Sequence, residues 1–201
     1  MSNKASYDLD GLPLLLTYDR SKIAGDYLFS KSPFNLKKCN NSKQDFIIWT
    51  SSKKLTREDF EGTKPDSSNA SAGASVKLRV TYVIKETSIS FDVRCLFFKE
   101  ESWFVYSDPG QRILLHEQGH FDIGEIFARK LRKDLSEAVK YTPIVSPRRL
   151  DSIYKAHAKA LNGMQVIYDD ETNHSLITDK QERWNLQIRK TLDSLNAYGA
   201  R

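Results

Sequence analysis

Apolar residues occupy every second position in two neighbouring stretches of the chain, residues 76–84 and 88–98. The repeated positions are Val76, Leu78, Val80, Tyr82 and Ile84 in the first stretch, and Ile89, Phe91, Val93, Cys95 and Phe97 in the second. A period of two is the repeat of a β-strand with one buried face, so these stretches predict an antiparallel hairpin. Residues 102–106 form a third candidate strand.

The repeat changes to that of a helix from Gln111 onward. Its apolar positions are Leu115, Phe121, Ile123, Ile126, Phe127, Leu131 and Leu135. This stripe predicts an amphipathic helix that ends near Tyr141. A second helix is expected over residues 148–163 and a third over residues 179–198, with a polar loop at residues 168–178 between them. Because strands come first and helices follow, the order predicts an α+β fold.

The beginning of the chain lacks such a pattern. Residues 1–44 show no sustained period and are expected to form an irregular N-terminal segment, whereas residues 45–201 are expected to form a single domain. Shorter elements are expected as well: a strand near Leu12–Thr17, a strand over residues 46–49, a helical turn at Thr56–Asp59 and a loop over Gly62–Ser75.

Composition narrows the possible functions only slightly. The 201 residues carry a net charge of +5, an excess too small to predict a nucleic-acid partner. No apolar run approaches the roughly 18 residues of a membrane-spanning helix, and no export signal is expected in the sequence. Two cysteines without a C-x-x-C pair exclude a cysteine-based zinc site within one chain. Cys95 is expected to be a buried thiol, and a disulfide to Cys39 is the alternative in an exported protein.

The sequence His-Glu-Gln-Gly-His at residues 116–120 carries the clearest chemistry. His116 and His120 are four residues apart on the predicted helix, so both imidazoles can reach one zinc ion. Glu117 lies beside them, where its carboxylate can act as general base toward a water that zinc has made more acidic. The pattern therefore predicts a zinc-dependent hydrolase built on this helix.

The residues around this motif extend the interpretation. The stretch Leu114–Ile123 (LLHEQGHFDI), together with residues 128–131, 55–62 and 168–174, resembles the bacterial family catalogued as domain of unknown function 922, described as secreted zinc-dependent proteases. Trp49, Trp103, Gln181 and Trp184 belong to the same resemblance. It implies a zincin-like fold, a Zn²⁺ cofactor, a peptide or protein substrate and a periplasmic or secreted location. The chain has Arg57 where the family usually has tryptophan, and Ser175 where it usually has glycine.

A catalytic zinc site usually has a third protein ligand. At 100° per residue, Asp122 and Glu125 point away from the two histidines, and both are interpreted as groups outside the metal site. His174, in the stretch that carries the resemblance, is the expected third ligand. Glu171 and His157 are the alternatives, although His157 lies on an apolar helix face where a core histidine bonded to a neighbour is expected.

Other polar groups receive supporting roles. Asp169 and Asp170 are candidates for orienting a ligand imidazole. The expected activity is peptide-bond hydrolysis with His116, His120 and His174 as zinc ligands and Glu117 as the base. A catalytically silent binding module on the same scaffold is the alternative function, and the intact Glu117 favours the enzyme.

Overall fold

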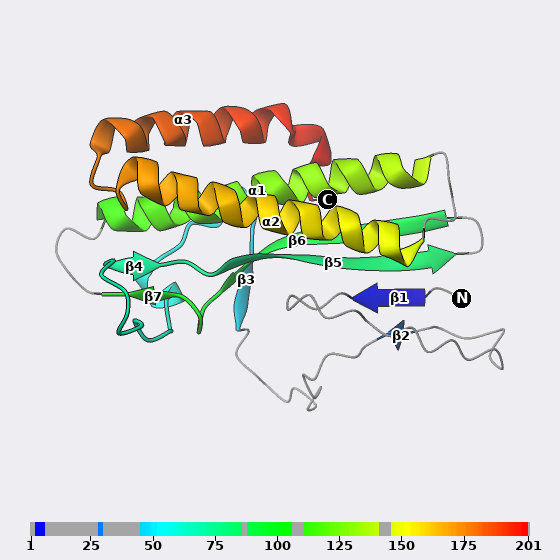
Figure 1. The fold of residues 1–201 in the computed structure, drawn as a ribbon, viewed down its shortest axis with the longest axis horizontal. Coiled ribbons are helices and arrows are strands. Elements are labelled where there is room, and N and C mark those ends of the chain that lie inside the picture. Colours follow the sequence, from blue (N-terminus) through cyan, green and yellow to red (C-terminus); the bar gives the residue numbers. More distant parts are fainter. Residues whose placement is uncertain are drawn as a thin grey trace.

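The computed structural model describes residues 3–6, 28–29, 45–85, 88–105, 111–140 and 146–200. Figure 1 shows a sheet covered on one face by two long helices, with a third helix on the far side of that pair. This mixed arrangement of helices and antiparallel strands agrees with the α+β prediction. Cys39 and the expected strand at Leu12–Thr17 lie outside the described residues.

The predicted hairpin is the centre of the main sheet. Strand β5 (Val76–Lys85) pairs antiparallel with β6 (Ser88–Phe98), in a register that runs from Val76 opposite Phe97 to Lys85 opposite Ser88. The sheet has the order β2-β1-β5-β6-β3. Its other strands are β1 (Asn3–Ser6), β2 (Leu28–Phe29) and β3 (Phe46–Ile48).

Two sequence predictions need correction here. Strands β1 and β2 lie within residues 1–44, which were expected to be irregular. Strand β4 (Ala72–Gly73) lies within the expected loop at residues 62–75. It pairs with β7 (Trp103–Phe104) in a separate two-stranded sheet, and β7 confirms the third candidate strand. Such short strands depend on pairing with a neighbour, and a hydrophobic period cannot reveal them.

The helices begin where the sequence suggested, but one continues further. Helix α1 (Gln111–Lys140) matches its prediction closely, and α3 (Thr178–Ser194) is followed by a 3-10 turn at Asn196–Tyr198. Helix α2 (Pro147–Thr172) passes through Gly163, where the sequence had suggested an end. An added β-carbon at Gly163 would meet nothing within 4 Å, so this glycine sits on an open helix surface and marks no turn.

Helix α1 packs closely on the hairpin. The rings of Phe97 on β6 and Phe121 on α1 lie 5.8 Å apart between their centroids, and both side chains are buried. Gly124 permits the approach, because a β-carbon there would collide with the side chains of Val76 and Cys95. Cys95 is the buried thiol that the strand pattern predicted. Within the described residues, no helix combines the length and apolar character needed to cross a membrane.

Candidate metal centre

Both histidines of the motif lie in the N-terminal half of α1, and both are buried. His116 and His120 are buried, at 2% and 6% exposure, and their Nε2 atoms lie 3.2 Å apart. The rings are nearly perpendicular, with centroids 4.8 Å apart. Four residues make just over one helical turn, which is why the two rings meet on the same face.

Helix α2 brings a carboxylate to the same point. Asp169 Oδ1 lies 2.9 Å from His116 Nε2 and 2.9 Å from His120 Nε2. The sequence had suggested that Asp169 orients an imidazole from a loop. The structure places it on a helix and against the inner nitrogens of both rings, where a ligand would lie.

The outer nitrogens of the two rings are held by glutamines. His116 Nδ1 lies 2.9 Å from Gln181 Oε1 on α3, and His120 Nδ1 lies 2.6 Å from Gln165 Oε1 on α2. Reasoning from the sequence missed both supports. The signal for Gln165 is its spacing four residues before Asp169, which places both on one face of α2 once the helix is continued past Gly163.

Tyr168 forms the floor beneath His116. Its ring stacks on the imidazole with centroids 4.5 Å apart and an interplanar angle of 14°. Its hydroxyl donates to the backbone carbonyl of His116 (3.2 Å) and accepts from Gln181 Nε2 (2.6 Å), and burial raises the pKa of this phenol well above its usual value. Gly119 makes room for it, because a β-carbon there would collide with the Tyr168 hydroxyl.

The expected third ligand, His174, lies at the edge of this cluster. Its side chain is 54% exposed, and its Nδ1 is 3.4 Å from Asp169 Oδ1. One potential ligand atom from each of His116, Asp169 and His174 fits within 4.8 Å of the others. The segment turns sharply, since Asn173, His174 and Ser175 have φ values of 46°, 49° and 74°. Ser175 thus adopts a left-handed conformation that favours the glycine expected there from the family resemblance.

The alternative ligands are occupied elsewhere. Glu171 Oε2 accepts a hydrogen bond from Trp184 Nε1 at 2.8 Å. His157 Nε2 pairs with Asp134 Oδ2 at 2.8 Å. His157 also lies about 18 Å from Asp169 along α2, at a rise of about 1.5 Å per residue. Neither side chain reaches the cluster of His116 and His120.

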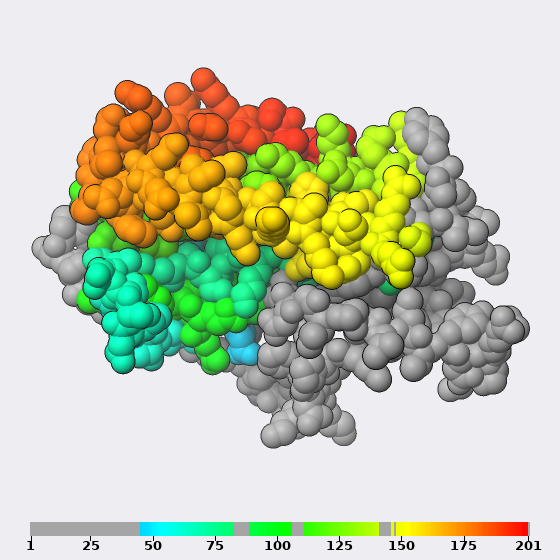
Figure 2. All heavy atoms as spheres, in the orientation of Figure 1, coloured from blue at the N-terminus to red at the C-terminus, as the bar shows by residue number. Residues whose placement is uncertain are grey.

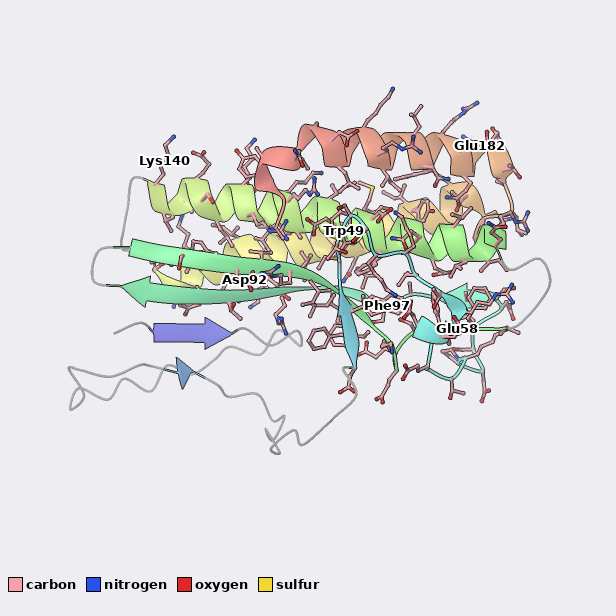
Figure 3. The ribbon with its side chains drawn as sticks, turned by 180° about the vertical axis from the view of Figure 1, so that it is seen from behind. Trp49, Glu58, Asp92, Phe97, Lys140 and Glu182 are labelled. Carbon is pink, nitrogen blue, oxygen red and sulfur yellow. The ribbon has the colours of Figure 1, made fainter. Side chains whose placement is uncertain are left out.

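The two acidic residues that follow the motif point away from it. Asp122 accepts from Trp49 Nε1 at 2.7 Å and from Gln118 Nε2 at 2.9 Å, on the side of α1 where Figure 3 shows Trp49. Glu125 is 1% exposed and pairs with Arg129. Both side chains lie away from the histidine pair, as the helix spacing predicts, and Glu125 is buried in the core.

Glu117 lies at the bottom of a cleft of about 620 Å³. Burial raises the pKa of its carboxyl, and the nearby His120 and His116 only partly offset this effect. Its Oε2 is buried, and no described residue forms a hydrogen bond with it. Figure 2 shows the two walls of the cleft, the middle and last turns of α2 in yellow to orange and the segment around β4 in teal. A buried carboxylate oxygen that lacks a partner is unusual in a folded protein and is expected to have a role other than packing.

At Asp169 and His120, burial and hydrogen bonding have opposite effects on the pKa. Burial disfavours the charged form of Asp169, but hydrogen bonds with His116 and His120 outweigh burial and hold its pKa well below the usual range. Burial also disfavours a charged His120, yet its hydrogen bond with Asp169 and the charge of Glu117 leave its pKa raised. The carboxylate therefore favours a positive charge between itself and the rings.

The geometry of the cluster suits a small cation. In a tetrahedral zinc site with bonds of about 2.0–2.1 Å, neighbouring ligand atoms lie about 3.3 Å apart. The separations among His116 Nε2, His120 Nε2 and Asp169 Oδ1 are 3.2, 2.9 and 2.9 Å. Two imidazoles and one carboxylate are also a donor set that zinc commonly takes. These three residues therefore fit the ion.

The chain matches no known protein family, no curated protein and no solved structure. Only the site itself therefore points to a function.

Proposed function

We propose that this protein is a zinc-dependent metallohydrolase that cleaves peptide bonds. In this proposal His116, His120 and Asp169 hold the ion, and Glu117 is the general base. His174 remains the alternative for the third position. The zincin-like character of the fold and the kinship with domain of unknown function 922 belong to the same proposal.

One observation carries the proposal. Three atoms of the kind that coordinate metals, His116 Nε2, His120 Nε2 and Asp169 Oδ1, converge within 3.2 Å of one another. Both Nδ1 atoms face glutamine oxygens and so carry protons, which means that hydrogen bonds from both Nε2 atoms to Asp169 would need two positively charged imidazoles side by side. Like charges at such a distance disfavour each other. A divalent cation satisfies all three atoms at once.

Glu117 supplies the proton transfer. When bound, zinc supplies Lewis acidity that polarises a substrate carbonyl and makes water more acidic. The Glu117 carboxylate takes the proton of the attacking water and delivers it to the amine nitrogen as the peptide bond breaks. Burial raises the pKa of Glu117, and this supports the first step because a more basic carboxylate takes up the proton of water more readily.

The cleft supports a peptide substrate. Its volume of about 620 Å³ lies within the range of about 300–1,000 Å³ typical of ligand pockets. Apolar side chains of Leu78, Tyr154 and Leu161 line it together with polar Asn162. A cleft lined by both apolar and polar side chains suits a peptide, which has apolar side chains and polar amide groups, better than a purely apolar ligand.

Zinc binding tests the proposal first. Protein purified without chelator, or titrated with zinc after dialysis, is expected to hold about one ion per chain. Asp169→Ala should lose most of this affinity, whereas Asp170→Ala, a neighbouring exposed carboxylate, should keep it. Wild-type protein that takes up no zinc would overturn the proposal.

His174→Ala separates the two possible ligand sets. If Asp169 is the third ligand, this variant retains zinc. Loss of zinc in His174→Ala together with retention in Asp169→Ala would assign the position to His174. Peptidase activity is then measured on a library of unstructured peptides by mass spectrometry, with and without zinc. A zinc-loaded protein that cleaves none of them would favour the silent binding module.

A further inference from the structure

We propose that Gln165 is a positioning residue that determines which nitrogen of His120 faces the metal. This inference rests on the proposed function, because it concerns the same site. It assigns a role to a neutral side chain on α2 that neither the motif nor the resemblance includes.

Two hydrogen bonds fix the orientation of the Gln165 amide. Its Nε2 donates to the backbone carbonyl oxygen of His120 at 3.1 Å, and its Oε1 lies 2.6 Å from His120 Nδ1. A carbonyl oxygen accepts and cannot donate, so the nitrogen of the amide must face it. The oxygen of Gln165 then faces the ring, and His120 Nδ1 must carry the proton.

A proton on Nδ1 determines the state of the other ring nitrogen, Nε2. A neutral imidazole with its proton on Nδ1 has its lone pair on Nε2, the atom that lies 2.9 Å from Asp169 Oδ1. The Gln165 amide therefore selects the tautomer that can bind a metal beside Asp169. It also restricts rotation of the ring, since it contacts both the side chain and the backbone of His120.

The helical spacing of α2 explains why both Gln165 and Asp169 contact His120. Gln165 and Asp169 are four residues apart, so they share the face of α2 that meets α1. Gln181 holds His116 in a similar way from α3, with its amide nitrogen against the Tyr168 hydroxyl. The Tyr168 hydroxyl donates its one proton to the His116 carbonyl, so the orientation of Gln181 is set through that second hydrogen bond, less directly than that of Gln165.

An amide suits this position better than a carboxylate. A metal-bound histidine often donates to a carboxylate, which raises the basicity of the ring. In Gln165→Glu, however, the second carboxylate oxygen would face the His120 carbonyl, and two acceptors would be left opposed. The position therefore requires a side chain with one acceptor and one donor, which glutamine supplies.

The test compares Gln165→Met, which keeps the length of the side chain but removes both hydrogen bonds, with Gln187→Met, the same change at an exposed position of α3. Zinc affinity is measured by competition with a chelator. Nitrogen-15 NMR of the zinc-loaded proteins reports which ring nitrogen of His120 carries a proton. We expect wild type and Gln187→Met to show a protonated Nδ1 and a metal-bound Nε2.

Gln165→Met should bind zinc about 10- to 100-fold more weakly. Its His120 signals should show a mixture of the two tautomers, or a metal-bound Nδ1 with a protonated Nε2. Gln165→Glu should fail to restore either property. Wild-type affinity in Gln165→Met overturns the inference, and so does weaker affinity with an unchanged His120 spectrum, which would mean loss of packing alone. If wild type itself binds no zinc, the proposed function fails first, and this result is distinct from both.

Discussion

Helix α1 buries two groups of polar side chains, and they differ in how fully their charges are neutralised. The group nearer its middle is closed. Glu125 Oε1 lies 3.1 Å from Arg129 Nε and 2.8 Å from Arg132 Nη1. The two arginines also donate to backbone carbonyls of Val93, Leu192 and Tyr198. This network ties α1 to β6, to α3 and to the C-terminal turn.

The group nearer the start of α1 is open. His116 Nε2, His120 Nε2 and Asp169 Oδ1 face one another, and Glu117 Oε2 has no hydrogen-bond partner. Removal of charged groups from water is costly unless they are paired, so an open group is expected to have a reason other than stability. The contrast supports the proposed function of the open group without reference to any relative.

Glu117→Gln gives the largest expected effect. The amide keeps the shape of the side chain but cannot accept the proton, so kcat should fall by about 10²- to 10⁴-fold. Zinc content and melting temperature should stay near the wild-type values. Steady-state kinetics on a confirmed peptide substrate give the measurement. A variant that cleaves at the parent rate would remove Glu117 from the mechanism, and one that loses zinc would make it a ligand.

Glu125→Gln tests the closed group. Loss of this negative charge leaves the buried Arg129 and the half-buried Arg132 without their ionic partner, and the free energy of unfolding should fall by about 3–5 kcal/mol. The zinc affinity of the folded protein should be unchanged. Urea denaturation and zinc titration measure the two quantities. If this variant loses zinc affinity while its stability is retained, the division into structural and functional groups is wrong.

Gly119→Ala should disturb the support of the open group. The added methyl collides with the Tyr168 hydroxyl, and the overpacking should cost about 1–3 kcal/mol and weaken zinc binding. Gly163→Ala is the matched control, because its methyl enters open space on a helix and should stabilise the protein by up to about 1 kcal/mol. Equal effects of the two changes on stability would contradict the close packing of Tyr168.

Ser175→Gly should have the smallest effect. Glycine adopts the φ of 74° without strain, and the change removes a buried hydroxyl that has no partner. The expected gain is about 1 kcal/mol in the free energy of unfolding. Thermal denaturation of the two zinc-free proteins measures it. A loss of stability would show that the Ser175 hydroxyl has a favourable role.

The sequence predicted the elements that have a strong period. The hairpin of residues 76–98 and helix α1 follow from alternation and from the apolar stripe, because each element buries one face along its whole length. The placement of His116, Glu117 and His120 on one helix followed directly. Elements held by pairing alone, such as β1 and β4, gave no comparable signal.

The position of Asp169 beside the two histidines could not be predicted from the sequence. Gly163 suggested the end of α2, and that boundary placed Asp169 in a loop, so its alignment with Gln165 was hidden. The sequence alone cannot distinguish a glycine on an exposed helix face from a glycine that ends a helix. Only the three-dimensional surroundings distinguish them. The role of Gly119 was equally hidden, since its neighbour Tyr168 is 49 residues away along the chain.

The separation of His116 from Asp169 by 53 residues has a consequence for the unfolded chain. On the proposed ligand set, a bound ion joins two distant positions as a covalent cross-link would, and it closes a long loop. In the chain-entropy treatment of cross-links, a loop of this length corresponds to about 4 kcal/mol. Chelation would then lower the free energy of unfolding by a similar amount and leave more of the chain unfolded and open to proteolysis. On this proposal, the ion that supports catalysis would also govern how long the protein survives.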